Sequence, residues 1–244
     1  GKYPNEKLLK KWPVSGPKML WQATGLGEGF SSPVIAKGKV YVTAMIDGEG
    51  FLFVFEKNGK QIGKHSYGEE WDGGHKGVRT TPTVVGDKLY LFTGYAHVVC
   101  MSTDGKVLWE VDTMEKFGAK QLHWGITESL VVDGDRVICT PGGPDVMIAI
   151  LDRFSGKTIK TIKGTGEESG YCSPVIVKHG KRRLLLTMTG ESVVGVDADT
   201  GEFLWSAPHA TRYDINPNTP LYYDGMIFTT SGYGTTGAQM FKLS

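Results

Sequence analysis

"VGVDADTGEFLWS", residues 194–206, places an aspartate, a glycine and a tryptophan at even steps, with an apolar run on either side. A strand that ends at Asp197, a turn residue with positive φ at Gly201 and a second strand that carries Trp205 account for this spacing. The indole on that outer strand would cover the seam to a neighbouring unit. We therefore expect Asp197, Gly201 and Trp205 to act in packing and docking.

Hairpin-like segments of one kind recur along the chain. Each begins with a short apolar strand, passes through a tight turn with glycine and ends in an alternating strand, which is the pattern of a β-hairpin. The five segments are SSPVIAKGKVYVTA from Ser31, TTPTVVGDKLYLFT from Thr80, TESLVVDGDRVICT from Thr127, CSPVIVKHGKRRLLLT from Cys172 and NTPLYYDGMIFTT from Asn218. Their third residues are separated by 49, 47, 45 and 46 positions, at Pro33, Pro82, Ser129, Pro174 and Pro220.

Further strand-like runs follow each hairpin. A third strand and, after a glycine turn, a fourth strand complete the first four repeats, and the fifth repeat ends after its third strand. Four short strands every 45 to 49 residues, without helical periodicity between them, are typical of a β-propeller blade. We predict a single domain over residues 1–244, with blades at about 31–66, 80–113, 126–163, 172–207 and 218–244.

The N-terminal stretch GPKMLWQA reads as an orphan outer strand over residues 17–22, with Trp21 at the docking position. Trp109 holds the equivalent position in the second repeat. The N-terminal strand would complete the last blade, because propellers close in this way to protect their edges. The prediction is an all-β propeller of four complete four-stranded blades plus one composite blade. It is either five-bladed or, as we favour, a fragment of a seven- to eight-bladed ring.

Composition narrows the functional classes. The 27 basic and 26 acidic residues leave no overall charge that favours nucleic acid, so we expect no nucleic-acid partner. The apolar runs are too short to span a bilayer, which predicts no transmembrane segment. Cys100, Cys139 and Cys172 lack metal-ligand spacing and lie in or beside apolar runs, which favours buried free thiols. No signal peptide is visible at Gly1.

The segment VDADTGEFLW and the SSP…GKVYV hairpins resemble the tryptophan-docking repeats of the pyrroloquinoline-quinone-like (PQQ-like) β-propellers, with Gly195 where that family usually has alanine. The resemblance covers residues 17–244. The family includes quinone-dependent alcohol and sugar dehydrogenases, the outer-membrane assembly scaffold lipoprotein and secreted propellers without an assigned role. It therefore predicts a fold and leaves several functions open. It also implies a periplasmic or extracellular location.

Loops that lead into the innermost strands of a propeller meet at one mouth of the channel, where ligands commonly bind. In this chain these loops are rich in aromatic and hydrogen-bonding side chains. A planar or polar ligand would stack on Trp124 or Tyr171 while Arg79 holds an anionic group. The candidate ligand-binding residues are Arg79, Trp124, Glu128, Tyr171, Asp214, Asn216 and Asn218. For each of them the alternative is a structural role, bonded to the backbone around a water-filled channel.

Three functions are compatible with these features. The first, which we favour, is a non-catalytic binding or scaffold propeller without a cofactor, whose partner is another protein or a small polar ligand. The second is a PQQ- and calcium-dependent oxidoreductase, with Glu128 and Asn218 as calcium ligands and Asp214 as the base. The chain lacks the adjacent-cysteine pair common in the resembling enzymes. The third is a carbohydrate-active enzyme that uses Glu28, Glu128 and Asp214 as funnel carboxylates.

Overall fold

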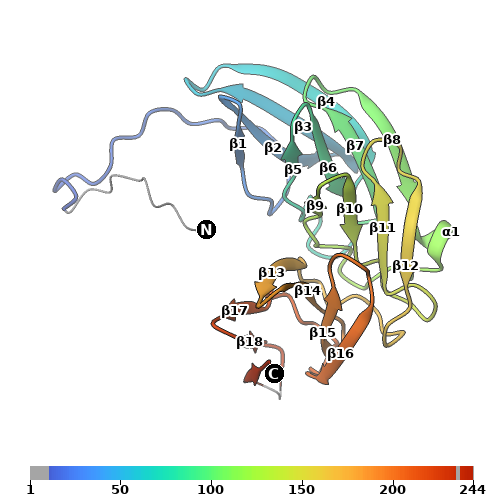
Figure 1. Cartoon of the computed structure of the whole chain (residues 1–244). Helices are drawn as coiled ribbons and strands as arrows, with labels where there is room; N and C mark the ends of the chain where they lie inside the picture. Colours follow the sequence, from blue (N-terminus) through green and yellow to red (C-terminus); the bar gives the residue numbers. More distant parts are fainter. Residues whose placement is uncertain (1–10, 235–236, 244) are drawn as a thin grey trace.

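Five antiparallel β-sheets lie side by side along an open arc in the computed structural model, which describes residues 11–234 and 237–243 (Figure 1). Four sheets have four strands each, and the last has three among these residues. In every sheet, strands that follow one another along the chain are hydrogen-bonded neighbours. This is the order of a propeller blade, so the predicted all-β propeller architecture is confirmed.

The strands follow the predicted repeats. Blade one contains β1 (Val34–Ala36), β2 (Lys39–Ile46), β3 (Glu49–Glu56) and β4 (Gln61–Glu69). Blade two contains β5 (Thr83–Val85), β6 (Lys88–Phe92), β7 (His97–Ser102) and β8 (Val107–Asp112), followed by a short helix, α1 (Thr113–Phe117). Blade three contains β9 (Val131–Asp133), β10 (Arg136–Cys139), β11 (Ile148–Asp152) and β12 (Thr158–Ile162). Blade four contains β13 (Val175–His179), β14 (Arg182–Met188), β15 (Ser192–Asp197) and β16 (Phe203–Pro208), and blade five contains β17 (Leu221–Tyr223), β18 (Met226–Thr230) and β19 (Ala238–Lys242).

The hydrophobic core lies between adjacent blades. Tyr41 and Leu52 of blade one, for example, share one cluster with Leu91 and Val99 of blade two. Further clusters join blades two and three, three and four, and four and five. Each blade therefore depends on its neighbours to bury its apolar faces, as in other repeat folds.

A β-bulge recurs at one place in each complete blade. The pairing between the third and fourth strands shifts by one residue in all four. In blade two, Cys100 pairs with Trp109 and Met101 with Val107, so Leu108 has no partner in the ladder. A bulge bends its strand and changes the direction of the neighbouring side chain. Here the residue after the bulge is the one at the docking position.

The side chain at the docking position contacts a turn glycine of the following blade. The indole of Trp109 lies over Gly156, where an added Cβ would come within 2.7 Å of Trp109 Cε3. Trp109 Nε1 also donates a hydrogen bond to the carbonyl oxygen of Arg153 at 3.1 Å. Gly156 has a φ of +69°, so glycine provides both the left-handed backbone and the space for the indole. His65 approaches Gly105 in the same way.

The turn after β15 has the form that its sequence predicts. Asp197 accepts a hydrogen bond from the backbone N–H of Asp199 at 3.0 Å, and Gly201 has a φ of +68°. Trp205 packs against a cluster drawn from blades four and five. Its indole also lies over Gly195 of its own blade, where a Cβ would be 2.2 Å from Trp205 Cε2. A glycine instead of the alanine usual in the resembling family makes room for this indole.

We expect Trp109→Ala to lower the free energy of unfolding by about 3 kcal/mol, because the change removes a large aromatic contact and a hydrogen bond across a blade seam. Urea unfolding followed by circular dichroism measures the difference. Trp12→Ala is the matched control, because the Trp12 side chain is 60% exposed. Equal unfolding midpoints for the two variants would contradict a docking role for Trp109.

Residues 17–22 form no strand, which differs from the predicted outer strand of a composite blade. Trp21 instead stacks on Phe55 of blade one, with ring centroids 5.8 Å apart, and donates through Nε1 to the carbonyl oxygen of Lys57 at 2.8 Å. The segment thus contacts blade one through Trp21, whose indole also lies over the turn glycine Gly59, where a Cβ would be 2.6 Å from Trp21 Cγ. Among the described residues β19 pairs only with β18. Residues 1–10, 235–236 and 244 of the predicted domain lie outside the described residues.

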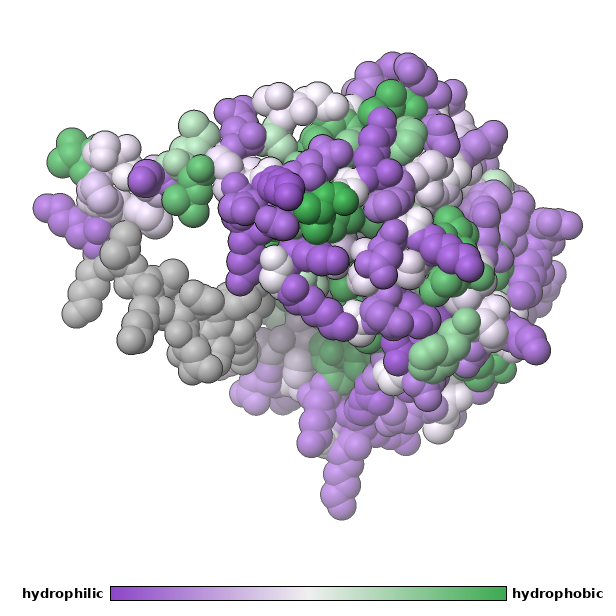
Figure 2. Space-filling model, turned by 90° about the horizontal axis from the view of Figure 1, so that it is seen from above, coloured by the Kyte–Doolittle hydropathy of each residue, from purple (hydrophilic) through white to green (hydrophobic). Residues whose placement is uncertain are grey.

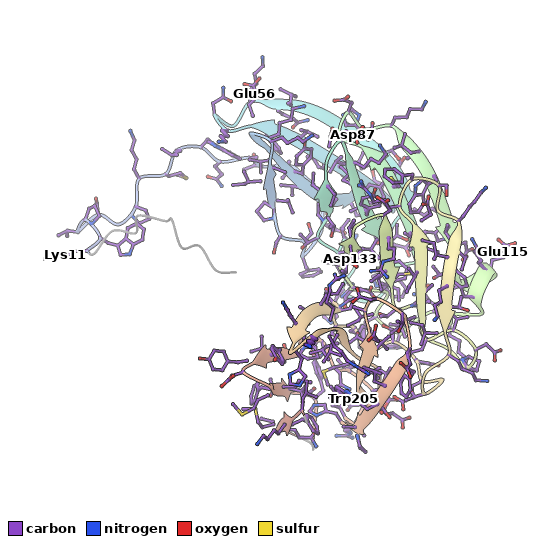
Figure 3. The ribbon with its side chains drawn as sticks, viewed as in Figure 1. Lys11, Glu56, Asp87, Glu115, Asp133 and Trp205 are labelled. Atoms are coloured by element: carbon purple, nitrogen blue, oxygen red, sulfur yellow. The ribbon has the colours of Figure 1, made fainter. Side chains whose placement is uncertain are left out.

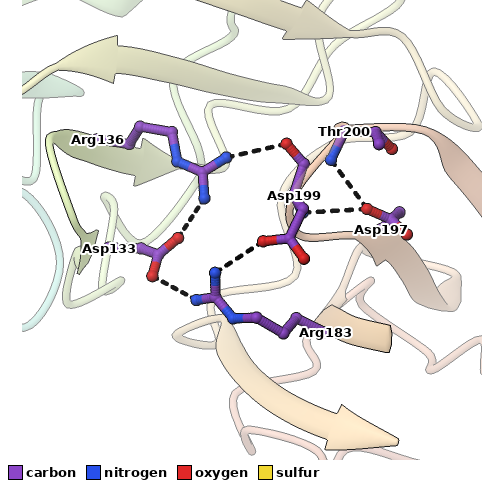
Figure 4. A network of polar contacts seen from close by, with 6 residues as sticks. All are labelled: Asp133, Arg136, Arg183, Asp197, Asp199 and Thr200. Carbon is purple, nitrogen blue, oxygen red and sulfur yellow. Dashed lines mark hydrogen bonds and ion pairs between the residues drawn. The ribbon is translucent and has the colours of Figure 1, made fainter. Parts of the chain in front are cut away.

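An ion-pair network joins blades three and four. The network includes Asp133, which lies on the inner side of the arc, opposite the outer side that carries Glu115 (Figure 3). The Asp133 carboxylate contacts both Arg136 and Arg183, and Arg183 Nη1 donates to Asp199 at 2.7 Å (Figure 4). Burial alone would raise the pKa of Asp133, but the hydrogen bonds from the two arginines lower it overall. The network ties β9 to β14 across the seam.

No helix in the part of the chain that the structure describes is long and apolar enough to cross a bilayer. On the face seen in Figure 2, hydrophobic residues form small separate patches among hydrophilic ones. The three cysteines are free and buried, as predicted, and burial raises the pKa of Cys100 and of Cys172 to about 11.

Candidate functional site

A cavity of about 890 Å³ lies where the loops between the blades meet. Each segment that leads into an innermost strand contributes to its lining, as the sequence predicts for a channel mouth. Phe30 precedes β1, Arg79 lies in the β4–β5 loop, Trp124 between α1 and β9, Tyr171 in the β12–β13 loop and Asp214 in the β16–β17 loop. Four of the seven candidate ligand-binding residues therefore line one cavity: Arg79, Trp124, Tyr171 and Asp214.

Hydrogen bonds between blades hold these loops in position. The backbone N–H of Ser32 donates to Thr81 Oγ1 at 3.0 Å, and the N–H of Thr81 donates to Ser129 Oγ at 3.0 Å. The N–H of Ser129 donates to Ser173 Oγ at 2.9 Å. Thr219 Oγ1 then donates to the carbonyl oxygen of Ser173 at 2.8 Å. These hydrogen bonds form a continuous series that connects the segments leading into all five innermost strands. A ligand would therefore bind to loops that are already ordered.

Trp124 is the central aromatic residue of the cavity. The imidazole of His123 meets it edge-on, with centroids 4.4 Å apart at 87°, and the ring of His75 lies 5.4 Å away. Gly74 lies below the indole, where a Cβ would come within 2.8 Å of Trp124 Cζ3. The indole is half-buried, so part of its surface is packed and part faces the cavity. This arrangement fixes a stacking surface in one orientation.

Arg79 brings a positive charge to the cavity and makes no ion pair within 4.0 Å among the described residues. Its Nη2 donates to the carbonyl oxygen of Gly74 at 2.8 Å and to that of His75, which orients the guanidinium. In the described residues no carboxylate oxygen lies within 4.0 Å of it, and its buried Nε has no hydrogen-bond partner. Burial lowers the pKa of Arg79, and the negative charge of Glu70 partly opposes this. The Nη1 group makes no hydrogen bond among the described residues, so it is the donor that remains for an anionic group of a ligand.

Three lining residues have left-handed backbone conformations that residues with side chains rarely adopt. The φ angles are +52° at His75, +72° at Tyr171 and +56° at Asp214. Such conformations cost free energy and are concentrated at ligand-binding and catalytic sites. The three residues come from different inter-blade loops. Four further residues with such conformations, Lys37, Asp47, Ala96 and Asp224, lie outside the lining, so the strain supports the candidate site and does not by itself identify it.

Glu128 does not line the cavity, and its prediction as a ligand-binding residue is wrong in position. Its side chain is fully buried and accepts hydrogen bonds from Thr140 N, at 3.0 and 3.2 Å, and from Thr140 Oγ1. In this repeat the hydroxyl of Ser129 accepts the hydrogen bond from the neighbouring blade. The side chain of the preceding residue, Glu128, points into the core instead. Burial raises the pKa of Glu128 to about 8, although the bonds from Thr140 oppose the shift.

Asn216 and Asn218 also lie outside the cavity lining, in contrast to the prediction. Asn216 is fully buried, and its Nδ2 donates to the carbonyl oxygens of Thr189 and Gly190, each at 2.9 Å, and of His209 at 3.0 Å. The exposed Asn218 donates through Nδ2 to the carbonyl oxygen of Thr230 at 3.0 Å. Both side chains satisfy the backbone of blades four and five, which is the structural alternative considered for them.

Sequence reasoning missed three exposed aromatic residues of the cavity. Phe30, Tyr213 and Tyr233 line it and are 65%, 58% and 47% exposed. Tyr233 follows β18, so it lies in a loop within blade five and not in a loop that leads into an innermost strand. Only loops of the second kind were expected at the mouth. Phe30 lies under the guanidinium of Arg79, whose Cζ is 5.6 Å from the ring centroid. For Phe30 the available signal in the sequence was a large aromatic residue directly before Ser31 and Ser32.

The acidic residues do not converge as the two enzyme alternatives require. Asp214 is the sole carboxylate of the lining within the described residues. Glu28 pairs with Lys76 at 3.1 Å outside the cavity, and Glu128 is buried on Thr140. No group of three or more His, Cys, Asp or Glu side chains in residues 11–234 and 237–243 could hold a metal ion. The donor set therefore does not fit the calcium ion over which a quinone cofactor would sit.

Comparisons with known proteins agree with the fold. A sequence profile described as "Outer membrane protein assembly factor BamB" matches residues 49–241. The structure is similar to BamB from Moraxella catarrhalis, with a TM-score of 0.61 and 16% identity over 88% of this chain and 60% of that chain. It is also similar to the quinohemoprotein alcohol dehydrogenase from Comamonas testosteroni, with a TM-score of 0.57 and 13% identity over 88% of this chain and 43% of that one.

A europium-containing methanol dehydrogenase has a TM-score of 0.57 and 14% identity over 86% of this chain and 56% of that chain. The chain thus spans 60% or less of the length of these three structures. At these identities the likeness concerns the fold. No curated protein sequence matches the chain.

Proposed function

The chain belongs to the PQQ-like repeat family of β-propellers that includes the assembly factor BamB, and from this membership we propose that it is a non-catalytic binding or scaffold propeller. The mouth cavity binds a segment of a partner protein. The observation that carries the proposal is the lining itself, because loops from five blades bring aromatic side chains around a single carboxylate. Aromatic residues supply large contact area with few rotatable bonds, and they are enriched where proteins bind one another.

The placement of the carboxylates favours binding over the two catalytic alternatives. Glycoside hydrolysis needs two carboxyl groups that face each other across the scissile bond. Asp214 has no such partner, since Glu28 is engaged with Lys76 and Glu128 is buried. Quinone-dependent oxidation would need oxygen ligands for calcium, and the proposed ligand Asn218 points to the carbonyl of Thr230 instead. We therefore propose no reaction in the cavity.

The proposal includes a location and a partner class. By its family the protein works in the periplasm or outside the cell, where a scaffold propeller meets other proteins. The near-balance of 27 basic and 26 acidic residues gives no general attraction to nucleic acid. The cavity, at about 890 Å³, has the size of a site that holds a few side chains of a partner.

Selection from a random-peptide display library tests the proposal. We expect the enriched peptides to lose most of their affinity for the Trp124→Ala and Tyr213→Ala variants and to keep it for Phe154→Ala. Phe154 is an exposed aromatic residue outside the cavity lining, so it is a matched control. Circular dichroism checks that each variant is folded. Peptides that bind all three variants as well as the wild type would contradict binding at the mouth.

A further inference from the structure

We infer that the mouth cavity selects a bipolar polypeptide segment, with an acidic side chain at the Arg79 end, a basic side chain at the Asp214 end and an apolar or aromatic side chain between them. This inference deepens the proposed function and rests on it. It concerns charge selection, which the aromatic lining alone does not provide.

The Arg79 end of the cavity is positive and has unused donors. Through Nη2 the guanidinium is held by two backbone carbonyl groups of its own loop, and its Nη1 makes no hydrogen bond among the described residues. The ring of Phe30 lies on one side of it at 5.6 Å. A planar, oriented guanidinium with free N–H groups binds a carboxylate better than a hydrated surface charge does.

The Asp214 end carries the one carboxylate of the described lining, while the Arg212 guanidinium, outside the lining, lies over the ring of Tyr213 at 5.1 Å from its centroid. Asp214 lies in the loop before blade five, whereas Arg79 lies in the loop before blade two, so the two charges enter the cavity from separate blades. In the described part of the chain no cationic nitrogen lies within 4.0 Å of the Asp214 carboxylate, which means that Asp214 and Arg79 do not neutralise each other. The left-handed backbone at Asp214 fixes the direction of this side chain at an energetic cost.

Tyr171 and Trp124 line the same cavity as the two charges. Burial raises the pKa of Tyr171; a hydrogen bond with the backbone of Trp124 opposes this, and smaller effects come from Glu168, which raises it, Arg79, which lowers it, and Asp214, which raises it. Both charges therefore act on the phenol of Tyr171. Trp124 lies beside it with an indole face available for stacking. A ligand that neutralises both ends would place its middle residue against these rings.

Charge complementarity explains why a peptide fits better than a simple anion. An isolated carboxylate would satisfy Arg79 and leave Asp214 without a partner. A segment with both charges pairs each end, and its peptide groups tolerate the polar rim of the cavity. The two imidazoles of His75 and His123 border the basic half, which adds hydrogen-bonding capacity there.

Three labelled peptides of equal length test the inference by fluorescence anisotropy. The first has the order Glu-Gly-Phe-Gly-Lys, the second has Gln in place of Glu, and the third has Gln in place of Lys. We expect each neutral replacement to weaken binding about tenfold. The same peptides with doubled glycine spacers test a longer distance between the two charged side chains. Arg79→Gln should abolish the preference for Glu, and Asp214→Asn should abolish the preference for Lys.

The diagnostic result is non-additivity. Removing both members of a charge pair should cost little more than removing one, as in a double-mutant cycle. Lys76→Gln and Asp224→Asn are the controls, because Lys76 lies in the same loop as Arg79, Asp224 lies in the β17–β18 turn of blade five, and neither residue lines the cavity. Arg79→Lys keeps the charge and should retain part of the preference.

Equal binding of all three peptides, or additive losses, would overturn the inference. Library peptides that depend on Trp124 but ignore Arg79 and Asp214 would overturn it as well, and would leave the proposed function intact. A library without any Trp124-dependent peptide would contradict the proposed function itself, so the two failures are distinct.

Discussion

Glu128→Gln should leave stability nearly unchanged near pH 5 and make the protein more stable than the wild type near pH 9. The wild-type carboxyl is fully buried, and its pKa is raised from 4.5 to about 8 in the folded chain. Between these values the folded chain holds a proton that the unfolded chain has released. Unfolding therefore releases a proton in this range, and raising the pH favours the unfolded state.

The wild type should lose roughly 5 kcal/mol of stability between about pH 4.5 and pH 8 through this group, at 1.36 kcal/mol per pKa unit. The glutamine variant keeps an acceptor and a donor for Thr140 and cannot ionise. Urea unfolding at a series of pH values measures the difference between the two proteins. Other titrating groups cancel in that difference.

Glu28→Gln is the control for this experiment. Glu28 belongs to the same set of loop glutamates, but its side chain is 47% exposed and pairs with Lys76. Its variant should follow the wild-type pH profile closely. Parallel profiles for Glu128→Gln and the wild type would mean that Glu128 is hydrated in solution, and the inward orientation would then be wrong.

The repeat architecture could be predicted from the sequence because its signals are local. Turn glycines, alternating apolar residues and an even spacing of about one blade are properties of short segments, and the five sheets follow them. The position of residues 17–22 could not be predicted in this way. Whether a strand-like segment pairs with the edge of a sheet depends on residues that are distant in the sequence. Here Trp21 stacks on Phe55 and donates a hydrogen bond to the carbonyl oxygen of Lys57.

The site could be predicted only in part for a related reason. Loop membership brought Arg79, Trp124, Tyr171 and Asp214 to the mouth correctly. It could not tell which way a loop side chain turns. Glu128 turns inward, because the next residue supplies the bond between blades. The left-handed backbone at three lining residues also leaves no trace in residue types alone.

Asn216→Ala should lower the free energy of unfolding by about 4 kcal/mol, and Asn216→Asp by at least as much. Asn216 is fully buried, and its amide group donates to the carbonyl oxygens of Thr189, Gly190 and His209. Alanine leaves these three buried acceptors without their donor, at about 1–3 kcal/mol for each that water does not reach. Aspartate has nearly the same shape but places an acceptor and a charge against the same three oxygens.

Asn218→Ala is the matched control, because it removes the same amide from the same loop at an exposed position with a single bond to Thr230. It should change stability by less than about 1 kcal/mol. Thermal and urea unfolding of the three variants measure the differences. If Asn216 bound a ligand and did not hold the loops, Asn216→Ala would unfold like the wild type and lose peptide binding. We expect the opposite, since its amide is already shared among two carbonyl oxygens of the β14–β15 turn and that of His209 after β16, and has no donor left to offer.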